Sequence, residues 1–225
     1  MLAVSYKADD KFFDFLKANN ISYIKTIANP NLDPRIADHP DLSIFPLDKD
    51  NIVVADEVYD YYKKMLADKN LIRGERVSKK YPLDSIYNII KFHDFYIHNA
   101  HTEKTIKKYF TDNKISHLMV KQGYTKCSTI VLKESLLTAD YGIYKALKDR
   151  LRVILLEDDY IRLDGFDKGF IGGCCGLVGN KLIFTGDISY HKSYDLIKKE
   201  CDREKIEIIY PEIDLVDLGS LISIG

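Results

Sequence analysis

The fold of this chain is decided by a pattern that is first complete in Val53–Tyr62, VVADEVYDYY. A short β-rich run leads through acidic residues into apolar residues at helical spacing. The same order returns at four other places, which are Ala3–Asp9, Tyr96–His101, Leu136–Asp140 and Ile183–Asp187. A repeat of roughly 40–50 residues is typical of solenoids, propellers and arrays. We therefore expect one structural unit that is used several times.

Each full unit is predicted to run strand, strand, helix, strand. In the first, the β-rich stretches Leu42–Phe45 and Asn51–Val54 flank the polar turn Asp48–Asp50. Asp56 is the expected N-cap of the helix, because its carboxylate can accept from first-turn amides. The chain then returns to the sheet at Leu71. The opening strands of the other full units are expected at Asp84–Ile90, Cys127–Leu132 and Phe170–Val178.

The two ends of the chain supply the parts of a fifth unit. Residues 1–26 contain a strand, a helix near Asp10–Ala18 and a strand at Ile21–Thr26, but lack an opening strand. The last residues supply one strand, Ser220–Ile224, and nothing more. Pairing of the two ends would close a ring without a free sheet edge. The alternative is an open three-layer α/β sheet, against which the doubled strand before each helix argues.

The expected fold class is thus α/β, a single domain of five ββαβ units arranged as a β/α propeller. The units are predicted at residues 1–26 plus 219–225, 39–80, 81–122, 123–165 and 166–215.

Composition narrows the class of protein. The 225 residues include 33 Lys+Arg and 34 Asp+Glu, a net charge of −1, without the basic excess that nucleic-acid binding usually requires. No apolar run approaches the about 20 residues of a membrane span. The four cysteines form no Cys-x-x-Cys motif, so we expect a reduced, cytoplasmic protein. Neither a cofactor nor an oligomeric state is implied.

Five strand-strand-helix-strand units, with the fifth split across the termini, resemble the pentein superfamily of guanidino-group-modifying enzymes and their non-enzymatic relatives. The phrases Asp38–Asp41 (DHPD) and Gly169–Gly176 (GFIGGCCG) resemble a bacterial, clostridial-type branch of it. The resemblance implies a cysteine nucleophile on the last opening strand, a histidine on a middle unit and carboxylates that hold a guanidinium. Here Gly219–Ser223 contains no cysteine, and Gly123–Ser128 contains Cys127 but no histidine. The standard Cys/His pattern is therefore expected to be absent.

A ring of similar strands brings the starts of its opening strands toward one axis. At these starts lie candidate catalytic residues, His39, Asp41, Cys127 and Cys174. Pro40 biases His39 toward an extended backbone and would hold an imidazole and a carboxylate at one strand mouth. Cys127 is a nucleophile if its thiol pKa is lowered; the alternative is a small core residue.

Candidate substrate-binding residues are Asp84, Asn88 and Cys175. Asp84 and Asn88 could bind a cationic or amide group, or could simply cap turns. Only one of Cys174 and Cys175 can face the axis, because side chains alternate along a strand. The glycines around them indicate close approach of a ligand or another strand.

The leading functional hypothesis is an axial pocket for a small cationic, guanidino- or amidino-type ligand, and a thiol-dependent hydrolase or amidinotransferase if the protein is an enzyme. The alternative is a non-catalytic pentein that binds a macromolecule such as a ribosomal subunit. A metal site at His93, His98 and His101 is not expected, since no Cys or Glu joins them at ligand spacing.

Overall fold

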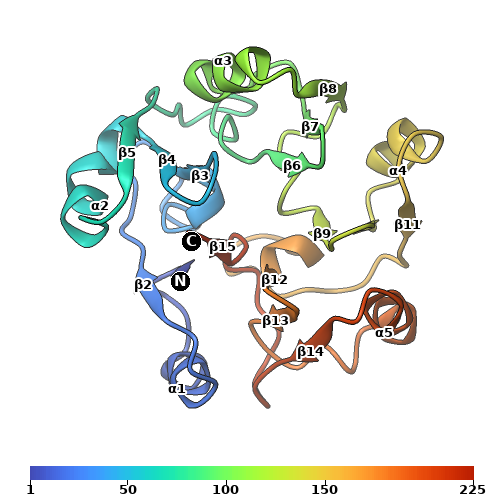
Figure 1. The fold of residues 1–225 in the computed structure, drawn as a ribbon. Helices are drawn as coiled ribbons and strands as arrows, with labels where there is room; N and C mark the ends of the chain where they lie inside the picture. Colours follow the sequence, from blue (N-terminus) through green and yellow to red (C-terminus); the bar gives the residue numbers. More distant parts are fainter.

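A computed structural model describes residues 1–225 and contains five three-stranded sheets around an axis, down which Figure 1 looks. In each sheet the middle strand pairs antiparallel with the first strand and parallel with the third. The sheets are β15-β1-β2 (Ile222–Ser223, Leu2–Val4, Tyr23–Lys25), β3-β4-β5 (Ile44–Pro46, Asn51–Val54, Asn70–Arg73), β6-β7-β8 (Ile90–Phe92, Phe95–His98, Ser116–Met119), β9-β10-β11 (Thr129–Val131, Leu136–Thr138, Val153–Leu155) and β12-β13-β14 (Cys175–Val178, Lys181–Phe184, Glu207–Ile209).

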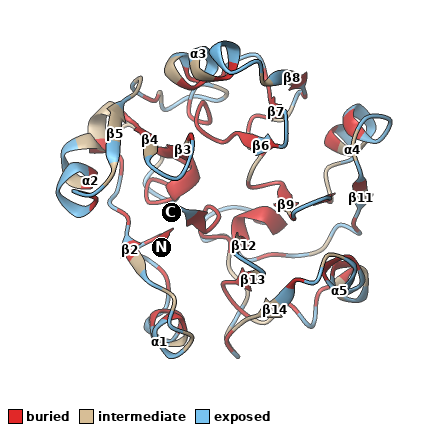
Figure 2. Cartoon of the chain, viewed as in Figure 1, coloured by how far each residue is buried: buried red, intermediate tan, exposed pale blue.

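One α-helix per unit connects the two parallel strands and lies at the periphery of the ring (Figure 1). Buried residues concentrate on the strands and on the inward sides of the helices, as Figure 2 shows. None of the helices has the length and apolar character needed to cross a membrane. The helices are α1 (Asp10–Ala18), α2 (Tyr59–Met65), α3 (Lys104–Asp112), α4 (Tyr141–Leu147) and α5 (Tyr194–Arg203), with the short 3-10 helices η1 (Pro40–Leu42), η2 (Asp56–Val58) and η3 (Ile171–Cys174).

The helix predictions depend on local sequence and were mostly right. Helix α1 begins after Asp9, whose carboxylate accepts from the Lys11 amide at 2.8 Å, and it buries Phe12, Phe13 and Leu16. The predicted N-cap at Asp56 was wrong. Its carboxylate instead pairs with the guanidinium groups of two arginines, Arg73 at 2.6 Å and Arg76 at 2.8 Å. Those ionic partners come from the strand after the helix and the loop beyond it, so the residues around Asp56 do not reveal them.

The chain ends close the ring as predicted. Strand β15 pairs antiparallel with β1, with Ser223 opposite Leu2 and Ile222 opposite Ala3. Both termini lie near the centre of Figure 1. The sheets remain five separate blades and do not merge into a continuous barrel. The open three-layer sheet is therefore excluded.

The opening strands were predicted to begin too early. Residues 40–42 and 171–174 form 3-10 helix, and β6 begins only at Ile90. These segments approach the axis, where segments of several units converge and a side chain of one unit pairs with the backbone of the next, as Asn88 does with the Lys126 and Cys127 amides. In a turn, neighbouring residues can direct their polar groups toward the same point. In a strand, successive side chains point to opposite faces of the sheet.

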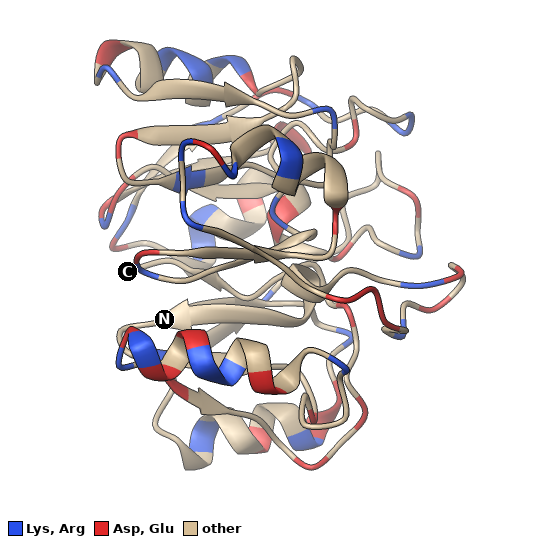
Figure 3. Cartoon of the chain, turned by 90° about the vertical axis from the view of Figure 1, so that its right-hand side faces the viewer, with Lys and Arg blue, Asp and Glu red and all other residues tan.

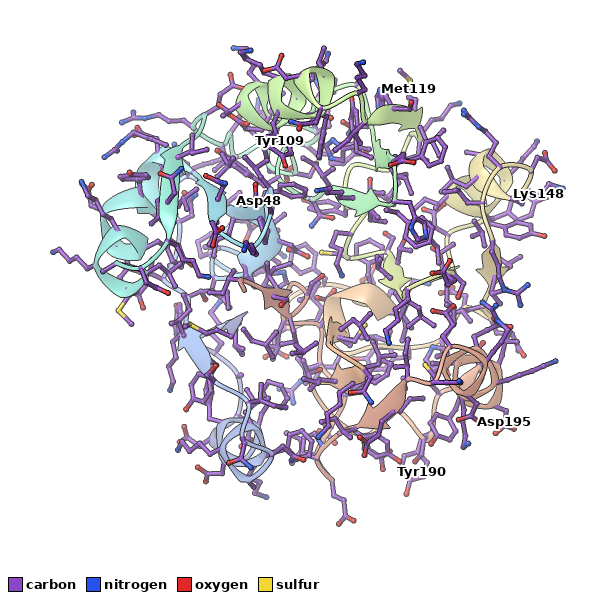
Figure 4. The ribbon with its side chains drawn as sticks, in the orientation of Figure 1. Asp48, Tyr109, Met119, Lys148, Tyr190 and Asp195 are labelled. Atoms are coloured by element: carbon purple, nitrogen blue, oxygen red, sulfur yellow. The ribbon has the colours of Figure 1, made fainter.

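Carboxylates connect neighbouring units. Glu103, at the start of α3, accepts from the Ile106 amide at 2.7 Å and from the Glu75 amide of the preceding unit at 3.0 Å. Glu204, after α5, accepts from the Lys133 amide at 2.8 Å. The Tyr109 hydroxyl of α3 lies 3.4 Å from the side chain of Asp48 in the β3–β4 turn, and both residues are labelled in Figure 4. The units are thus joined by polar contacts as well as by apolar packing.

Candidate functional site

Four turns that precede opening strands bring one polar cluster together at the axis. It consists of Asp41, Asn88, Cys127 and Ser220, and we call it the axial cluster. The Asp41 Oδ2 atom lies 2.9 Å from Cys127 Sγ and 2.6 Å from Ser220 Oγ. The Asn88 amide nitrogen donates to Cys127 Sγ at 3.1 Å. All four residues are buried, and their separation in sequence means that only the ring brings them into contact.

Asp41 is the group of this cluster whose pKa lies nearest to neutral pH. Burial raises its pKa, and the hydrogen bonds from Cys127 and Ser220 and the nearby Lys126 ammonium lower it, for a net value of about 6. Its second oxygen, Oδ1, is buried and has no hydrogen-bond partner. A buried acceptor without a partner costs free energy, so it is a feature that a bound donor would relieve.

A cavity of about 230 Å³ follows the axis and has Asp41 among its lining residues. Twelve of its 18 lining residues are hydrophobic, so the pocket surrounds one carboxyl group with an apolar wall. Lys126 and Lys91 also line it. The Lys91 ammonium already donates to the Leu47 carbonyl at 2.9 Å. Lys126 is therefore the one of these two lysines whose ammonium has no hydrogen-bond partner.

The cysteines are buried and protonated. Burial raises the pKa of Cys127 well above its ordinary value, and the charge of the Asp41 carboxylate is the second cause of this rise. Burial also raises the pKa of Cys175 to about 11 and that of Cys201 to about 12, and it raises the pKa of Cys174. Cys175 lines the axial cavity, whereas Cys174 packs into the apolar core beneath β12 and β13. The nucleophile hypothesis required a lowered thiol pKa, and this environment does the opposite.

We accordingly predict that iodoacetamide at pH 7 leaves Cys127, Cys174, Cys175 and Cys201 unmodified in the folded protein, and modifies all four in denaturant. The thiolate is the reactive species, and burial disfavours it at each position. Mass spectrometry of the digested protein reads the result one cysteine at a time. Selective modification of Cys127 under native conditions would contradict the prediction and restore it as an activated thiol.

His39 faces a different cavity. A second, polar cavity of about 440 Å³ is lined by His39, Asp38 and Asp217, and Asp41 is not among its lining residues. The 3-10 turn that starts at Pro40 explains the divergence, since successive residues rotate by about 120° at three residues per turn. Burial lowers the pKa of His39, so the imidazole is neutral and does not offer Cys127 the cation that the sequence argument assumed.

Asp84 and the three histidines also lie outside the axial cluster. Asp84 accepts from the Tyr124 hydroxyl at 2.6 Å, and burial raises the pKa of its carboxyl group. His98 is buried, and its ring contacts the carbonyls of Ser85 and Gly123, each at 3.1 Å. No group of three or more His, Cys, Asp or Glu side chains in the structure is arranged to hold a metal ion.

Two residues of the axis were missed by sequence reasoning, Ser220 and Asp217. Asp217 is buried, its carboxylate accepts from the Phe170 amide at 2.8 Å and the Gly219 amide at 2.9 Å, and burial raises its pKa. The glycines at 172 and 173 did indicate that another segment approaches the backbone there. A Cβ atom at Gly173 would lie 2.0 Å from Asp217 Oδ1, so the glycine marks the close approach of another segment, as the run had indicated.

Comparison with known proteins places this geometry in context. No curated protein matches the chain. Among solved structures, DDAH from Pseudomonas aeruginosa complexed with citrulline matches 94% of this chain and 91% of its own at 11% identity, with a TM-score of 0.56. Agmatine deiminase from C. jejuni matches 93% of this chain and 76% of its own at 11% identity, with a TM-score of 0.52. An amidinotransferase of the saxitoxin biosynthetic pathway from Microseira wollei matches 90% and 76% at 10% identity, with a TM-score of 0.50.

At these identities the solved structures establish the fold alone. All three have the pentein fold, so the predicted fold, a ring of five ββαβ units, is confirmed. The sequence itself matches a family described as a family of unknown function (DUF6873) along residues 3–222. The chain therefore belongs to the DUF6873 family and has the pentein fold.

Proposed function

We propose that the axial cavity binds a small ligand with a guanidinium or amidinium group, and that Asp41 receives this group. The observation that carries the proposal is Asp41, which lines a mostly apolar cavity and has one buried carboxyl oxygen, Oδ1, without a hydrogen-bond partner. A cation with N–H groups supplies both the charge and the donor that such an oxygen lacks. Three solved structures of similar fold are named for dimethylarginine, agmatine and amidino chemistry, which supports the same ligand class.

The size and lining of the cavity limit the ligand further. About 230 Å³ is less than the roughly 300–1,000 Å³ typical of sites for drug-sized molecules. Apolar walls such as Ile44, Phe45 and Leu182 favour an alkyl stem behind the charged head. Asp41 Oδ2 already contacts two side chains, so Oδ1 is the first acceptor for the ligand. An alkylguanidinium or alkylamidinium meets these conditions.

A thiol-dependent hydrolysis or amidino transfer is the narrower proposal at the same site. Cys127 is the cysteine that contacts Asp41, so its thiolate would attack the central carbon of the bound group and form a tetrahedral adduct. Collapse of the adduct would break one C–N bond, and the departing amine would take up the proton that the thiol gave up. Water or an acceptor amine would then displace the sulfur from the carbon. In the ligand-free protein the Asp41 carboxylate raises the pKa of this thiol. A cation bound at Asp41 would offset that charge and favour the thiolate. His39 and Cys174 face other surroundings and have no part in this step.

Macromolecular binding, the alternative considered from the sequence, gains no support from the similar structures. Lys and Arg residues are interspersed with Asp and Glu residues along the helices and loops, as the colours of Figure 3 show. Such mixing does not form the single-sign face that attracts a charged partner over a distance.

A thermal-shift series tests the ligand proposal. Methylguanidinium, agmatine and acetamidinium should raise the melting temperature of the wild-type protein, because a ligand that binds only the folded state stabilises it by mass action. The neutral isostere N-methylurea should have a smaller effect. Asp41→Asn should weaken binding of the cations by about ten- to a hundredfold, as expected for a lost charged hydrogen bond.

Asp84→Asn is the matched control, since Asp84 is also a buried carboxyl group with a raised pKa but does not line the axial cavity. It should retain the response of the wild type. Equal responses of Asp41→Asn and the wild-type protein would reject Asp41 as the ligand's partner. The absence of any response to the three cations would reject the ligand class.

A further inference from the structure

The hydrogen bonds of the axial cluster reveal where its protons are. The Asn88 side-chain oxygen accepts from two backbone amides, those of Lys126 at 2.7 Å and Cys127 at 3.1 Å. These contacts fix the orientation of the amide, so its nitrogen must be the atom that points to Cys127 Sγ. The sulfur therefore accepts from Asn88 and directs its own proton to Asp41 Oδ2.

The contacts of Ser220 show how many protons the axial cluster holds. Its hydroxyl oxygen lies 2.6 Å from Asp41 Oδ2 and 3.0 Å from the Gly172 carbonyl oxygen. A carbonyl oxygen only accepts, and a hydroxyl has a single proton. If Ser220 donates to Gly172, the contact with Asp41 is a hydrogen bond only when Asp41 carries the second proton. If Asp41 is ionised, Ser220 turns its proton to the carboxylate, and the Gly172 carbonyl keeps only the long, weak contact from Cys175 Sγ at 3.9 Å.

The protonated form of Asp41 is thus the one that satisfies all three short contacts. It also explains Oδ1, because the carbonyl oxygen of a neutral carboxyl group costs less to leave without a partner than a carboxylate oxygen does. The backbone holds the arrangement in place: Ser220 has a positive φ of 63°, and a Cβ atom at Gly172 would lie 2.4 Å from the backbone oxygens of Lys126 and Thr129.

The charged and titratable groups around Asp41 come from every element packed against it. Burial is the strongest influence and raises its pKa, and Lys126 acts in the opposite direction. Asp217, another buried carboxyl group, is close enough for its own pKa to be raised by Asp41. Cys127 is a thiol, and Cys175, on the cavity wall, has a pKa of about 11 and is uncharged near neutral pH.

We propose that the axial pocket releases one proton when it binds a cationic ligand. The inference rests on the proposed function and adds a mechanism for selecting charge. At pH 5 Asp41 of the ligand-free protein holds a proton and Ser220 donates to Gly172. When an alkylguanidinium reaches Oδ1, the Asp41 proton leaves to the solvent, and Ser220 turns its hydroxyl proton to the carboxylate. No covalent bond changes except the O–H bond of Asp41, and the cation replaces the charge of the departed proton.

The sign of the pH dependence follows. The ligand binds the ionised form of Asp41, so its affinity rises with pH while the free protein is still protonated and levels off above the pKa. With a pKa of about 6, affinity for methylguanidinium should increase about tenfold between pH 5 and pH 7. A neutral isostere, N-methylurea, should show neither this rise nor a proton release.

Calorimetry with methylguanidinium in two buffers of different ionisation enthalpy measures the proton directly. We expect close to one proton released per ligand at pH 5 and close to none at pH 8. Binding without proton release at pH 5, or with an affinity independent of pH, would overturn the inference while leaving the proposed ligand class intact.

A ligand-free measurement separates the two proposals. The folded protein should hold the Asp41 proton between the ordinary pKa of 3.8 and the raised value of about 6. The stabilisation that this proton provides is therefore lost as pH rises through that window. The melting temperature of the wild type relative to Asp41→Asn should fall as pH rises from 4 to 7. A constant difference would overturn the inference, even if no cation bound and the proposed function had already failed.

Discussion

Deletion of residues 220–225 is expected to abolish cooperative folding or to lower the melting temperature by more than about 10 °C. The deleted segment contains β15, which covers one edge of β1. It also contributes three buried side chains, Leu221, Ile222 and Ile224. Each is worth about 1.5–3 kcal/mol when fully buried, so their sum is comparable with the about 5–15 kcal/mol by which proteins of this kind are stable.

The loss should exceed the effect of the missing side chains alone. Without β15, the backbone of β1 presents an unpaired edge, which is a template for aggregation. Ser223→Ala is the control, because Ser223 belongs to the same strand but is exposed; it should change stability by no more than about 0.5 kcal/mol. Thermal and urea unfolding measure both. A truncated chain that melts with the wild type would show that the ring does not depend on closure by the C-terminal strand.

Gly172→Ala should destabilise the protein by about 3 kcal/mol or more, at the upper end of what overpacking costs. The new methyl group would lie 2.4 Å from two backbone oxygens, those of Lys126 and Thr129. Backbone atoms cannot rotate away as the end of a side chain can, so the turn before β9 or η3 itself must shift. Such a shift would also separate the Gly172 carbonyl from Ser220 and disturb the axial cluster.

Gly142→Ala provides the comparison. Gly142 lies in helix α4, where an added Cβ would meet only the side-chain oxygen of Asp140, at 3.0 Å. Alanine is favoured over glycine inside a helix by about 0.5–1 kcal/mol, so this variant should be close to the wild type or slightly more stable. Denaturant unfolding of the two variants gives the difference. Equal stability of the two variants would contradict the prediction, because it would mean that the backbone around Gly172 can shift at little cost in free energy.

The architecture could be read from the sequence because it depends on short-range patterns. A run of β-branched residues marks β4, helical spacing marks α1, and Asp140 was placed at the start of the helix that it caps through the Ile143 amide. The split fifth unit was also visible, since a missing strand at one end and an unpaired strand at the other imply each other. The strands, the helices and the split unit can be predicted from residues a few positions apart and from the order of the elements along the chain.

The same patterns failed where the chain approaches the axis. The apolar run Phe170–Val178 was predicted as one strand, but Ile171–Cys174 is a 3-10 helix and only Cys175–Val178 is strand. Likewise the phrase that contains His39 and Asp41 was read as one site, and the turn at Pro40 directs the two side chains to separate cavities. Local propensity could not predict these turns, because the groups that stabilise them come from other units.

The sequence by itself determined the ring of five units and the pairing of its ends. It also identified Asp41, Asn88 and Cys127 as residues at the starts of opening strands. Only the tertiary structure decided that these three meet Ser220, and that the cysteines are buried thiols. The reason is distance along the chain: Asp41 contacts Cys127 across 86 positions and Ser220 across 179. The pKa of each group depends on that three-dimensional burial and on partners which no local pattern specifies.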